Sequence, residues 1–196
     1  MKNLQKYKDN LIEASKNIDI QVINKIEKLI YKKILQGKQI FTCGNGGAAS
    51  VSNHFLCDFN KSIKISSKKK LKPRVISLSS DIENILAISN DISFNEIFSF
   101  QLENYYKPGD LLITFSCSGS SKNISNVINF AKSKKLNTIS FTGFASKKIQ
   151  KITDINFNAN IKNYGISEDI FQSLLHMISQ SIRQKFISKK NKSIIL

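Results

Sequence analysis

The chain has 196 residues, which suits one domain with a substantial core, and no internal repeat or break in composition divides it. Its formal charge of +16 would suit a nucleic acid or an anionic surface. The cations are nearly all lysines, spread without interleaved aromatic residues or a DNA-reading motif, so nucleic-acid binding is not predicted. The positive charge would instead help to attract a phosphorylated small molecule.

The N-terminal segment 1–10 is polar and charged, and no apolar run reaches membrane-spanning length. We therefore expect no signal peptide, no membrane association and a cytoplasmic protein. Cys43, Cys57 and Cys117 form no CxxC motif, which fits a reducing compartment. We expect all three to fill small apolar spaces rather than to act in redox chemistry or metal binding.

Helical and strand patterns alternate along the chain. Apolar residues recur at helical spacing over 3–35, which predicts one or two helices outside a sheet and a plausible oligomer surface. The lysine-rich segment 62–72 is expected to be an exposed loop, and the tail from Ser188 to be frayed. Five short β-rich runs predict an α/β fold, a parallel sheet with helices on both faces. These runs are 39–42, 74–78, 111–115, 137–141 and 154–157.

A glycine-rich turn, CGNGG at 43–47, follows the first predicted strand. Its glycines allow positive φ angles and a close approach of the backbone to a ligand. In the helix that follows, His54 and Asp58 stand four residues apart and therefore share a face.

A serine-rich turn follows the third predicted strand, in the run LLITFSCSGSSKN at 111–123. The first N–H groups of the next helix lack partners there, the helix dipole favours an anion, and serine hydroxyls add donors. No Lys follows the glycine as in a Walker loop, so the pattern favours a small phosphate ester. The alternative is an ordinary turn that caps the helix at Ser121.

The second histidine, His176, lies on the last helical pattern, 167–186, eight residues after Glu168. That spacing puts both side chains on neighbouring stripes of one face. If the two helices meet, the two imidazoles and two carboxylates form either a metal site or a proton-transfer site. The plainer alternatives are a surface pair or a satisfied buried histidine, with Ser167 as an N-cap followed by acids in the first turn.

Together these segments resemble the sugar isomerase (SIS) domain family, in particular its phosphoheptose isomerase branch. The resemblance covers almost the whole chain and is carried by CGNGGAASVSNHFLCDF, ISFNEIFSFQL, PGDLLITFSCSGSSKNISNVINFAKSKKLNTISFTGF and SEDIFQSLLHMI. It implies a three-layer flavodoxin-like fold, with residues 1–196 as a single SIS domain and a helical extension at about 1–36. It also implies a homotetramer with active sites between subunits.

The resemblance further implies roles for individual residues. The phosphate would be bound by Ser116, Ser118 and Ser121, and the sugar by Asn45, Gly46, Gly47, Asp91 and Glu168. Zinc or a similar divalent metal would be held by His54, Asp58, Glu168 and His176. Asp58 would also be the catalytic base, with His176 as its partner acid or base.

Four positions depart from the family pattern. Asp58 replaces the commoner Glu, and Glu168 stands where many members have Gln, but both keep a ligand oxygen. Ala48 replaces a serine that helps to hold the ligand, and Phe171 stands where relatives often have a further His. The missing hydroxyl at Ala48 bears on substrate affinity.

The expected activity is that of an aldose–ketose isomerase, which converts D-sedoheptulose 7-phosphate to D-glycero-D-manno-heptose 7-phosphate through an enediol. One alternative is a non-catalytic tetrameric regulator that binds protein, although the retained histidines and carboxylates argue against it. Another is an isomerase or binder of a different sugar phosphate, because the fold does not name the sugar.

Overall fold

The computed structural model describes residues 2–144 and 147–187, and its centre is a five-stranded parallel sheet. The strand order is β2-β1-β3-β4-β5, with Ile40 paired with both Val75 and Leu111. The bounds are β1 Gln39–Gly44, β2 Arg74–Ser77, β3 Leu111–Ser116, β4 Asn137–Thr142 and β5 Ile155–Asn158. All five predicted strands are confirmed, with ends that differ by at most two residues.

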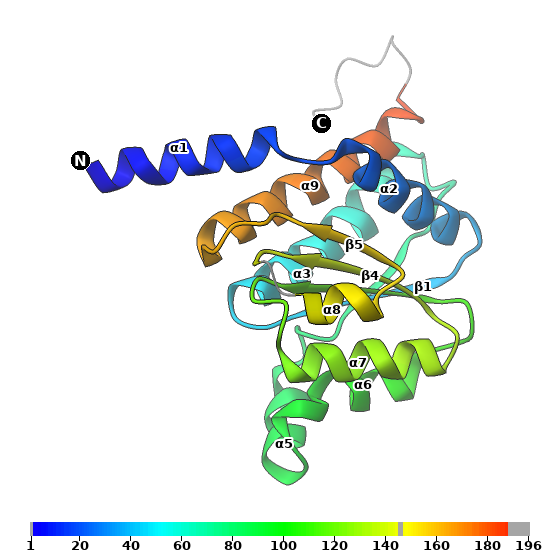
Figure 1. Ribbon diagram of the computed structural model, residues 1–196. Helices are drawn as coiled ribbons and strands as arrows, with labels where there is room; N and C mark the ends of the chain where they lie inside the picture. The colour runs from blue at the N-terminus through cyan, green and yellow to red at the C-terminus, as the bar shows by residue number, and fades with distance from the viewer. Residues whose placement is uncertain (1, 145–146, 188–196) are drawn as a thin grey trace.

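Helices cover both faces of the sheet (Figure 1). One face carries α2 (Ile20–Leu35), α3 (Gly47–Cys57) and α9 (Tyr164–Gln184). The opposite face carries α5 (Ile82–Asp91), the short η2 (Phe94–Glu96), α6 (Ile97–Tyr105), α7 (Lys122–Ser133) and α8 (Lys147–Ile152). The three-layer α/β prediction is therefore confirmed.

The alternation of side chains along β3 explains the two layers of core. Every residue of β3 is buried, and successive side chains point to opposite faces. Ile113 and Phe115 belong to the core beneath α3 and α9, whereas Leu112 belongs to the core beneath α6 and α7. Burial of each such side chain contributes about 1.5–3 kcal/mol, so both helical layers are fixed to the sheet.

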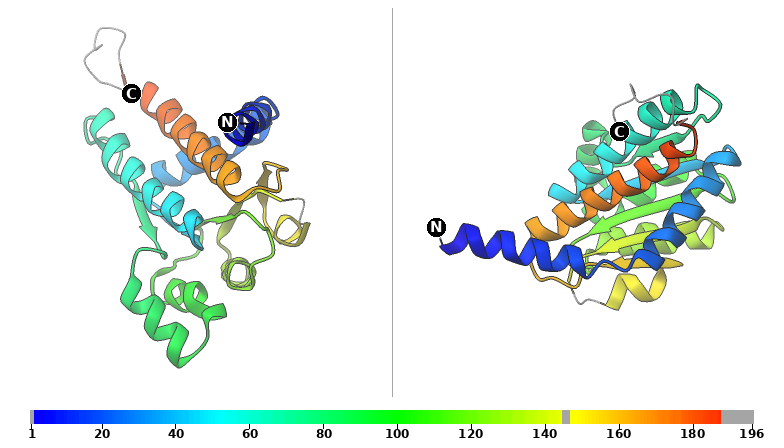
Figure 2. Two further views of the ribbon diagram at one scale, coloured as in Figure 1. Left: turned by 90° about the vertical axis from the view of Figure 1, so that its left-hand side faces the viewer. Right: turned by 90° about the horizontal axis from the view of Figure 1, so that it is seen from above.

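The N-terminal prediction resolves into two helices, α1 (Lys2–Lys16) and α2. Helix α1 projects beyond the sheet and lies against the start of α9 (Figures 1 and 2). The Tyr7 hydroxyl donates a 2.7 Å hydrogen bond to Asp169 Oδ2, whereas Leu4 is 78% exposed. The predicted fraying from Ser188 lies outside the described residues. Within the described chain, no helix is both long and apolar enough to cross a membrane.

The prediction of an exposed loop at 62–72 is wrong for its first half. Helix α3 continues through a π-helix, η1 (Asp58–Ile63), into α4 (Lys64–Ser66), and Ile63 is fully buried. The Asn60 amide bonds both the N–H and the C=O of Val75, each at 3.0 Å. These bonds tie the extended helix to the edge strand β2, and the lysine pattern alone did not reveal this anchor.

Gly44 provides a test of how closely β1 approaches α3. A Cβ added there would lie 2.5 Å from the Ala48 carbonyl oxygen, which belongs to the backbone and cannot swing away. Gly44→Ala should lower the free energy of unfolding by about 3 kcal/mol through overpacking. Gly37→Ala is the control, because Gly37 has φ +66° and no atom within 4 Å of an added Cβ. It should cost only the backbone term of about 1 kcal/mol. Equal losses in urea unfolding would contradict this packing.

Candidate active site

The glycine turn and the serine turn lie side by side at the carboxyl ends of the neighbouring strands β1 and β3, where ligands bind in such sheets. They share a pocket of about 300 Å³. It is lined by Asn45, Gly46, Gly47, Ala48, Phe115, Ser116, Cys117, Ser118, Ser121, Tyr164 and Glu168. Every residue predicted to contact substrate is present in this lining except Asp91.

The serine turn leaves hydroxyl groups available to a ligand. Ser121 occupies the N-cap position of α7, yet its side chain makes no capping hydrogen bond. The alternative of a helix capped at Ser121 is thus confirmed in position, but the side-chain bond of a serine cap is not formed. The Ser116 hydroxyl is buried and has no hydrogen-bond partner among the described residues. Such an unpaired group costs about 1–3 kcal/mol, and a ligand oxygen in the pocket would satisfy it.

The glycine turn is held from two sides. The Ser79 hydroxyl accepts from the Gly44 N–H at 3.0 Å and donates to the Gly44 carbonyl at 2.9 Å. Gly46 takes φ +56°, a conformation that glycine adopts easily. A Cβ at Gly47 would collide with the Glu168 carboxylate, so a glycine is needed there to let Glu168 enter the pocket. Sequence reasoning missed the part played by Ser79.

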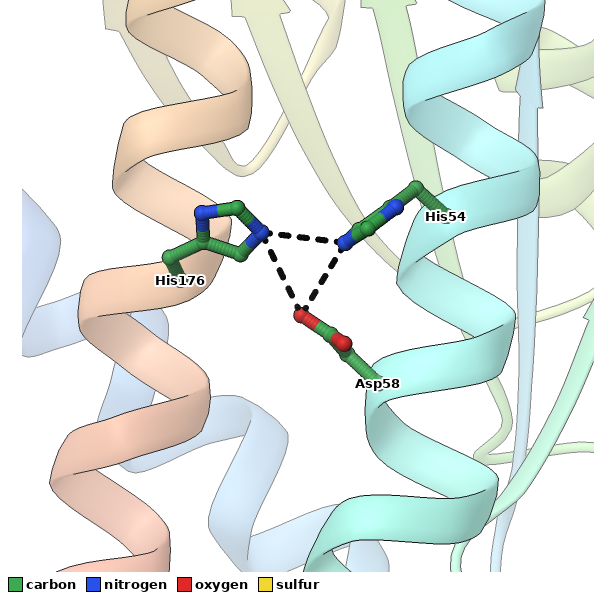
Figure 3. Close-up of side chains that lie close together, drawn as sticks. All are labelled: His54, Asp58 and His176. Atoms are coloured by element: carbon green, nitrogen blue, oxygen red, sulfur yellow. Dashed lines mark hydrogen bonds and ion pairs between the residues drawn. The ribbon is translucent and has the colours of Figure 1, made fainter. Parts of the chain in front are cut away.

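His54, Asp58 and His176 converge although the two histidines are 122 residues apart in sequence (Figure 3). The two Nε2 atoms lie 3.0 Å apart. Asp58 Oδ2 lies 3.4 Å from His54 Nε2 and 3.6 Å from His176 Nε2. The predicted meeting of the two helices is confirmed, and we call these three residues the triad.

The donor atoms of the triad suit a divalent metal. All three ligand atoms lie within 4.8 Å of one another, and imidazole nitrogen with carboxylate oxygen is a common zinc donor set. Two Nε2 atoms at 3.0 Å repel each other unless a proton or a cation lies between them. Gln172, which sequence reasoning did not assign to the site, places its side-chain amide 2.9 Å from His176 Nε2.

Glu168 lies in the pocket and is not part of the triad. Its carboxylate contacts Gly47, and its Oε1 lies 3.7 Å from the Cys117 sulfur. Helices α3 and α9 run side by side in the same direction, so Gly47 faces Glu168 and His54 faces His176. His54 lies seven residues after Gly47 along α3, a rise of about 10 Å. The structure thus brings together three of the four predicted metal ligands, with the fourth in the neighbouring pocket.

Helix α9 begins earlier than predicted, so that Glu168 lies in its second turn. The helix begins at Tyr164 rather than at Ser167, and Asn163 caps it by accepting a 3.1 Å hydrogen bond from the Ile166 N–H. The interpretation of Ser167 as the N-cap is therefore wrong. Ser167 is fully buried and donates to the Asn163 carbonyl at 2.7 Å.

Asp91 lies apart from the pocket within one chain. It is exposed at the end of α5, on the opposite side of the sheet from α9, and accepts a 2.8 Å hydrogen bond from Asn90 (Figure 1). Asp91 therefore does not line the pocket with the other residues predicted to contact the sugar.

The three cysteines differ in environment. Burial raises the pKa of Cys117 to about 12, with the nearby Glu168 charge adding to the effect. Burial also raises the pKa of Cys43. Both are neutral packing groups, as expected, whereas Cys57 is exposed and its predicted role as apolar filling is wrong.

The other two departures from the family pattern lie in packed positions. Ala48 is buried and lines the pocket. Phe171 is fully buried, with its ring centroid 6.2 Å from that of Phe115 and 6.0 Å from that of Phe141. Phe171 therefore belongs to the hydrophobic core and contributes no donor atom to the triad.

Known proteins match this sequence and this fold. Residues 5–143 match the SIS domain. A probable phosphoheptose isomerase of Thermoplasma acidophilum is 32% identical over 183 residues, 93% of this chain and 98% of its own. A phosphoheptose isomerase of Helicobacter pylori is 31% identical over 186 residues, 95% of this chain and 91% of its own.

The solved structure of a phosphoheptose isomerase from Neisseria gonorrhoeae superposes with a TM-score of 0.84, covering 93% of this chain and 98% of that one. Its 23% identity supports a likeness of fold. The full-length relatives and the domain match together define the family. The chain belongs to the SIS domain family, and within that family to the phosphoheptose isomerase branch.

The triad predicts measurable metal binding. After removal of metal with a chelator, Zn²⁺ should bind the protein, and His54→Ala and His176→Ala should each weaken binding by at least about tenfold because each removes one donor. Asp91→Ala, which removes an exposed carboxylate outside the triad, should leave the affinity unchanged. Titration against a chromophoric chelator measures the dissociation constants. Wild-type affinity in both histidine variants would contradict the assignment.

Proposed function

We propose that this protein is an aldose–ketose isomerase that interconverts D-sedoheptulose 7-phosphate and D-glycero-D-manno-heptose 7-phosphate. One observation carries the proposal. The pocket shared by the two turns and the triad both lie between the same two helices, α3 and α9. The relatives named phosphoheptose isomerase support the choice of a heptose phosphate.

The phosphate is held at the serine turn. Ser116, Ser118 and Ser121 line the pocket, and α7 begins immediately after Ser121, so its dipole also favours the anion. The sugar then extends past Asn45 and the backbone of Gly46 and Gly47. The rise of about 10 Å along α3 suits a substrate with its phosphate at one end of a seven-carbon chain and its carbonyl region at the other.

Proton transfer occurs at the triad. Asp58 takes a proton from C1 of the ketose, and the electron pair of the broken C–H bond forms the double bond of an enediol. Return of that proton to C2 gives the aldose, while His176 moves a proton from O1 to O2. Both close contacts of Asp58 use Oδ2. The carboxylate can therefore serve as a ligand through Oδ2 and as a base through Oδ1.

We propose zinc as the metal at this site. His54, His176 and Asp58 would hold it, and when bound it would polarise the substrate carbonyl. Glu168 is proposed as the fourth ligand and also as a sugar contact. To reach the triad, its carboxylate has to leave its position beside Gly47.

The active protein is proposed to be a homotetramer with sites completed between subunits. Large apolar side chains are exposed on the two helices at the extremes of the fold, with Leu4 on α1 at 78%, and Ile82 and Leu86 on α5 at 60% and 63%. Such side chains suit burial between subunits. In a tetramer, α5 of a neighbouring subunit would bring Asp91 to the sugar. The cytoplasmic location stays a prediction.

Removal of two serine hydroxyls should weaken substrate binding. In the Ser118→Ala/Ser121→Ala variant, each lost hydrogen bond to the charged phosphate costs about 1.5 kcal/mol or more, so KM should rise by about 100-fold. Ser133→Ala is the control, because Ser133 lies at the far end of α7 and its hydroxyl bonds the Phe130 carbonyl. An unchanged KM in a folded double variant would move the phosphate out of this turn.

Loss of the proposed acid or base should lower turnover strongly without abolishing binding. Asp58→Asn and His176→Gln should each lower kcat by about 10²–10⁴, while both proteins still bind the sugar phosphate. Glu103→Gln, an exposed change on α6, should have no effect. Product formation is followed by NMR with metal supplied. If the wild type turns over no heptulose, hexulose or pentulose phosphate, the non-catalytic regulator becomes the better account.

A further inference from the structure

The side chains of Asn45 and Asn123 form a reciprocal pair that joins the glycine turn to the serine turn. Asn45 Nδ2 donates to Asn123 Oδ1, and Asn123 Nδ2 donates to Asn45 Oδ1, both at 2.9 Å. Asn123 is 2% exposed and does not line the pocket, whereas Asn45 is half-buried and lines it. Asn123 can therefore affect a ligand through Asn45 without touching it.

A backbone group fixes the direction of both amides. The Ile124 N–H donates to Asn123 Oδ1 at 2.9 Å, and a backbone N–H can only donate. Asn123 Oδ1 must therefore face the Ile124 N–H. Because the same oxygen also faces Asn45, Asn45 has to present its nitrogen to it. If the Asn45 amide flipped, its oxygen would face the Asn123 oxygen and its nitrogen would face the Asn123 nitrogen, and both hydrogen bonds would be lost. One N–H and one oxygen lone pair of Asn45 remain for a ligand.

The same bond also serves the first turn of α7. The first turn of α7 has N–H groups without helical partners, and Asn123 satisfies the one at Ile124. The Ser121 side chain makes no capping bond. Asn123 Oδ1 thus accepts from both the Ile124 N–H and Asn45 Nδ2, and the test below separates these two contacts.

We propose that Asn123 is a positioning residue that sets the direction of the Asn45 amide and thereby the affinity for the sugar portion of the substrate. The proposal rests on the proposed function, in which Asn45 contacts the sugar. A merely structural Asn123 would support α7 and the serine turn, and its loss would weaken phosphate binding as well as sugar binding. A positioning Asn123 acts on the sugar portion alone.

A double-mutant cycle with two probes separates these roles. The dissociation constants of sedoheptulose 7-phosphate and of inorganic phosphate are measured by calorimetry for the wild type, Asn123→Ala, Asn45→Ala and the double variant. Asn123→Ala should weaken sugar-phosphate binding by about tenfold and change inorganic-phosphate binding by less than about twofold. In the Asn45→Ala background, the added Asn123→Ala change should have no further effect on sugar-phosphate binding.

Asn126→Ala is the matched control on the same helix, because its half-buried amide bonds Glu96 and the Asn95 carbonyl rather than the pocket residues. It should leave both dissociation constants unchanged. If Asn123→Ala does not fold, Asn123→Ser keeps an oxygen near the Ile124 N–H but is too short to pair with Asn45, and it should give the same pattern.

Equal weakening of both probes, additive effects in the cycle, or wild-type binding of the sugar phosphate by a folded Asn123 variant would overturn the positioning role. Turnover of sedoheptulose 7-phosphate by the wild type tests the proposed function separately. Because the cycle is measured as binding, it tests Asn123 whether or not turnover occurs.

Discussion

The parallel contact between α3 and α9 is the constraint on which the whole site depends. Near the N-terminal ends of the two helices, the Glu168 carboxylate lies against Gly47. Further along the same contact, His54 Nε2 lies 3.0 Å from His176 Nε2. Both helices are fixed by aromatic packing on the sheet, with Phe55 and Phe171 fully buried in the same core. A shift of either helix by one residue would separate the triad, because successive helical residues are rotated by about 100°.

The site also depends on polar groups that the fold leaves without internal partners. The Ser116 hydroxyl is buried and unpaired, and Ser121 stands at a helix N-terminus without capping it. Elsewhere in the same turns, polar groups are tightly satisfied, as in the Ser79 bonds to Gly44 and the Asn45–Asn123 pair. A preorganised anion site is expected to combine hydroxyl donors that are free to bind the anion with neighbouring polar groups that are held in place by hydrogen bonds.

The strands, the layers and the two turns could be predicted from local sequence. Apolar residues repeat with a period of 2 in strands and 3.6 in helices, and glycine and serine residues mark the turns. His54 and Asp58 share a helix, so their proximity was predictable, and the rarity of histidine pointed to His176. The position of Glu168 could not be predicted. It depends on the start of α9 at the Asn163 cap and on the absence of a side chain at Gly47. The helical path through Ile63 and the pairing of Asn123 with Asn45 depend on contacts between distant segments that no local pattern encodes. Gln172 contacts His176 one turn along the same helix.

The most direct test of the proposed isomerase is conversion of sedoheptulose 7-phosphate in D₂O by the metal-loaded wild-type protein, followed by ¹H and ¹³C NMR. The account predicts a heptose 7-phosphate in which C2 carries solvent deuterium, because a proton held on Asp58 in a partly exposed triad exchanges with water between its removal from C1 and its return. Absence of any aldose product, with zinc bound and the protein folded, would contradict the account.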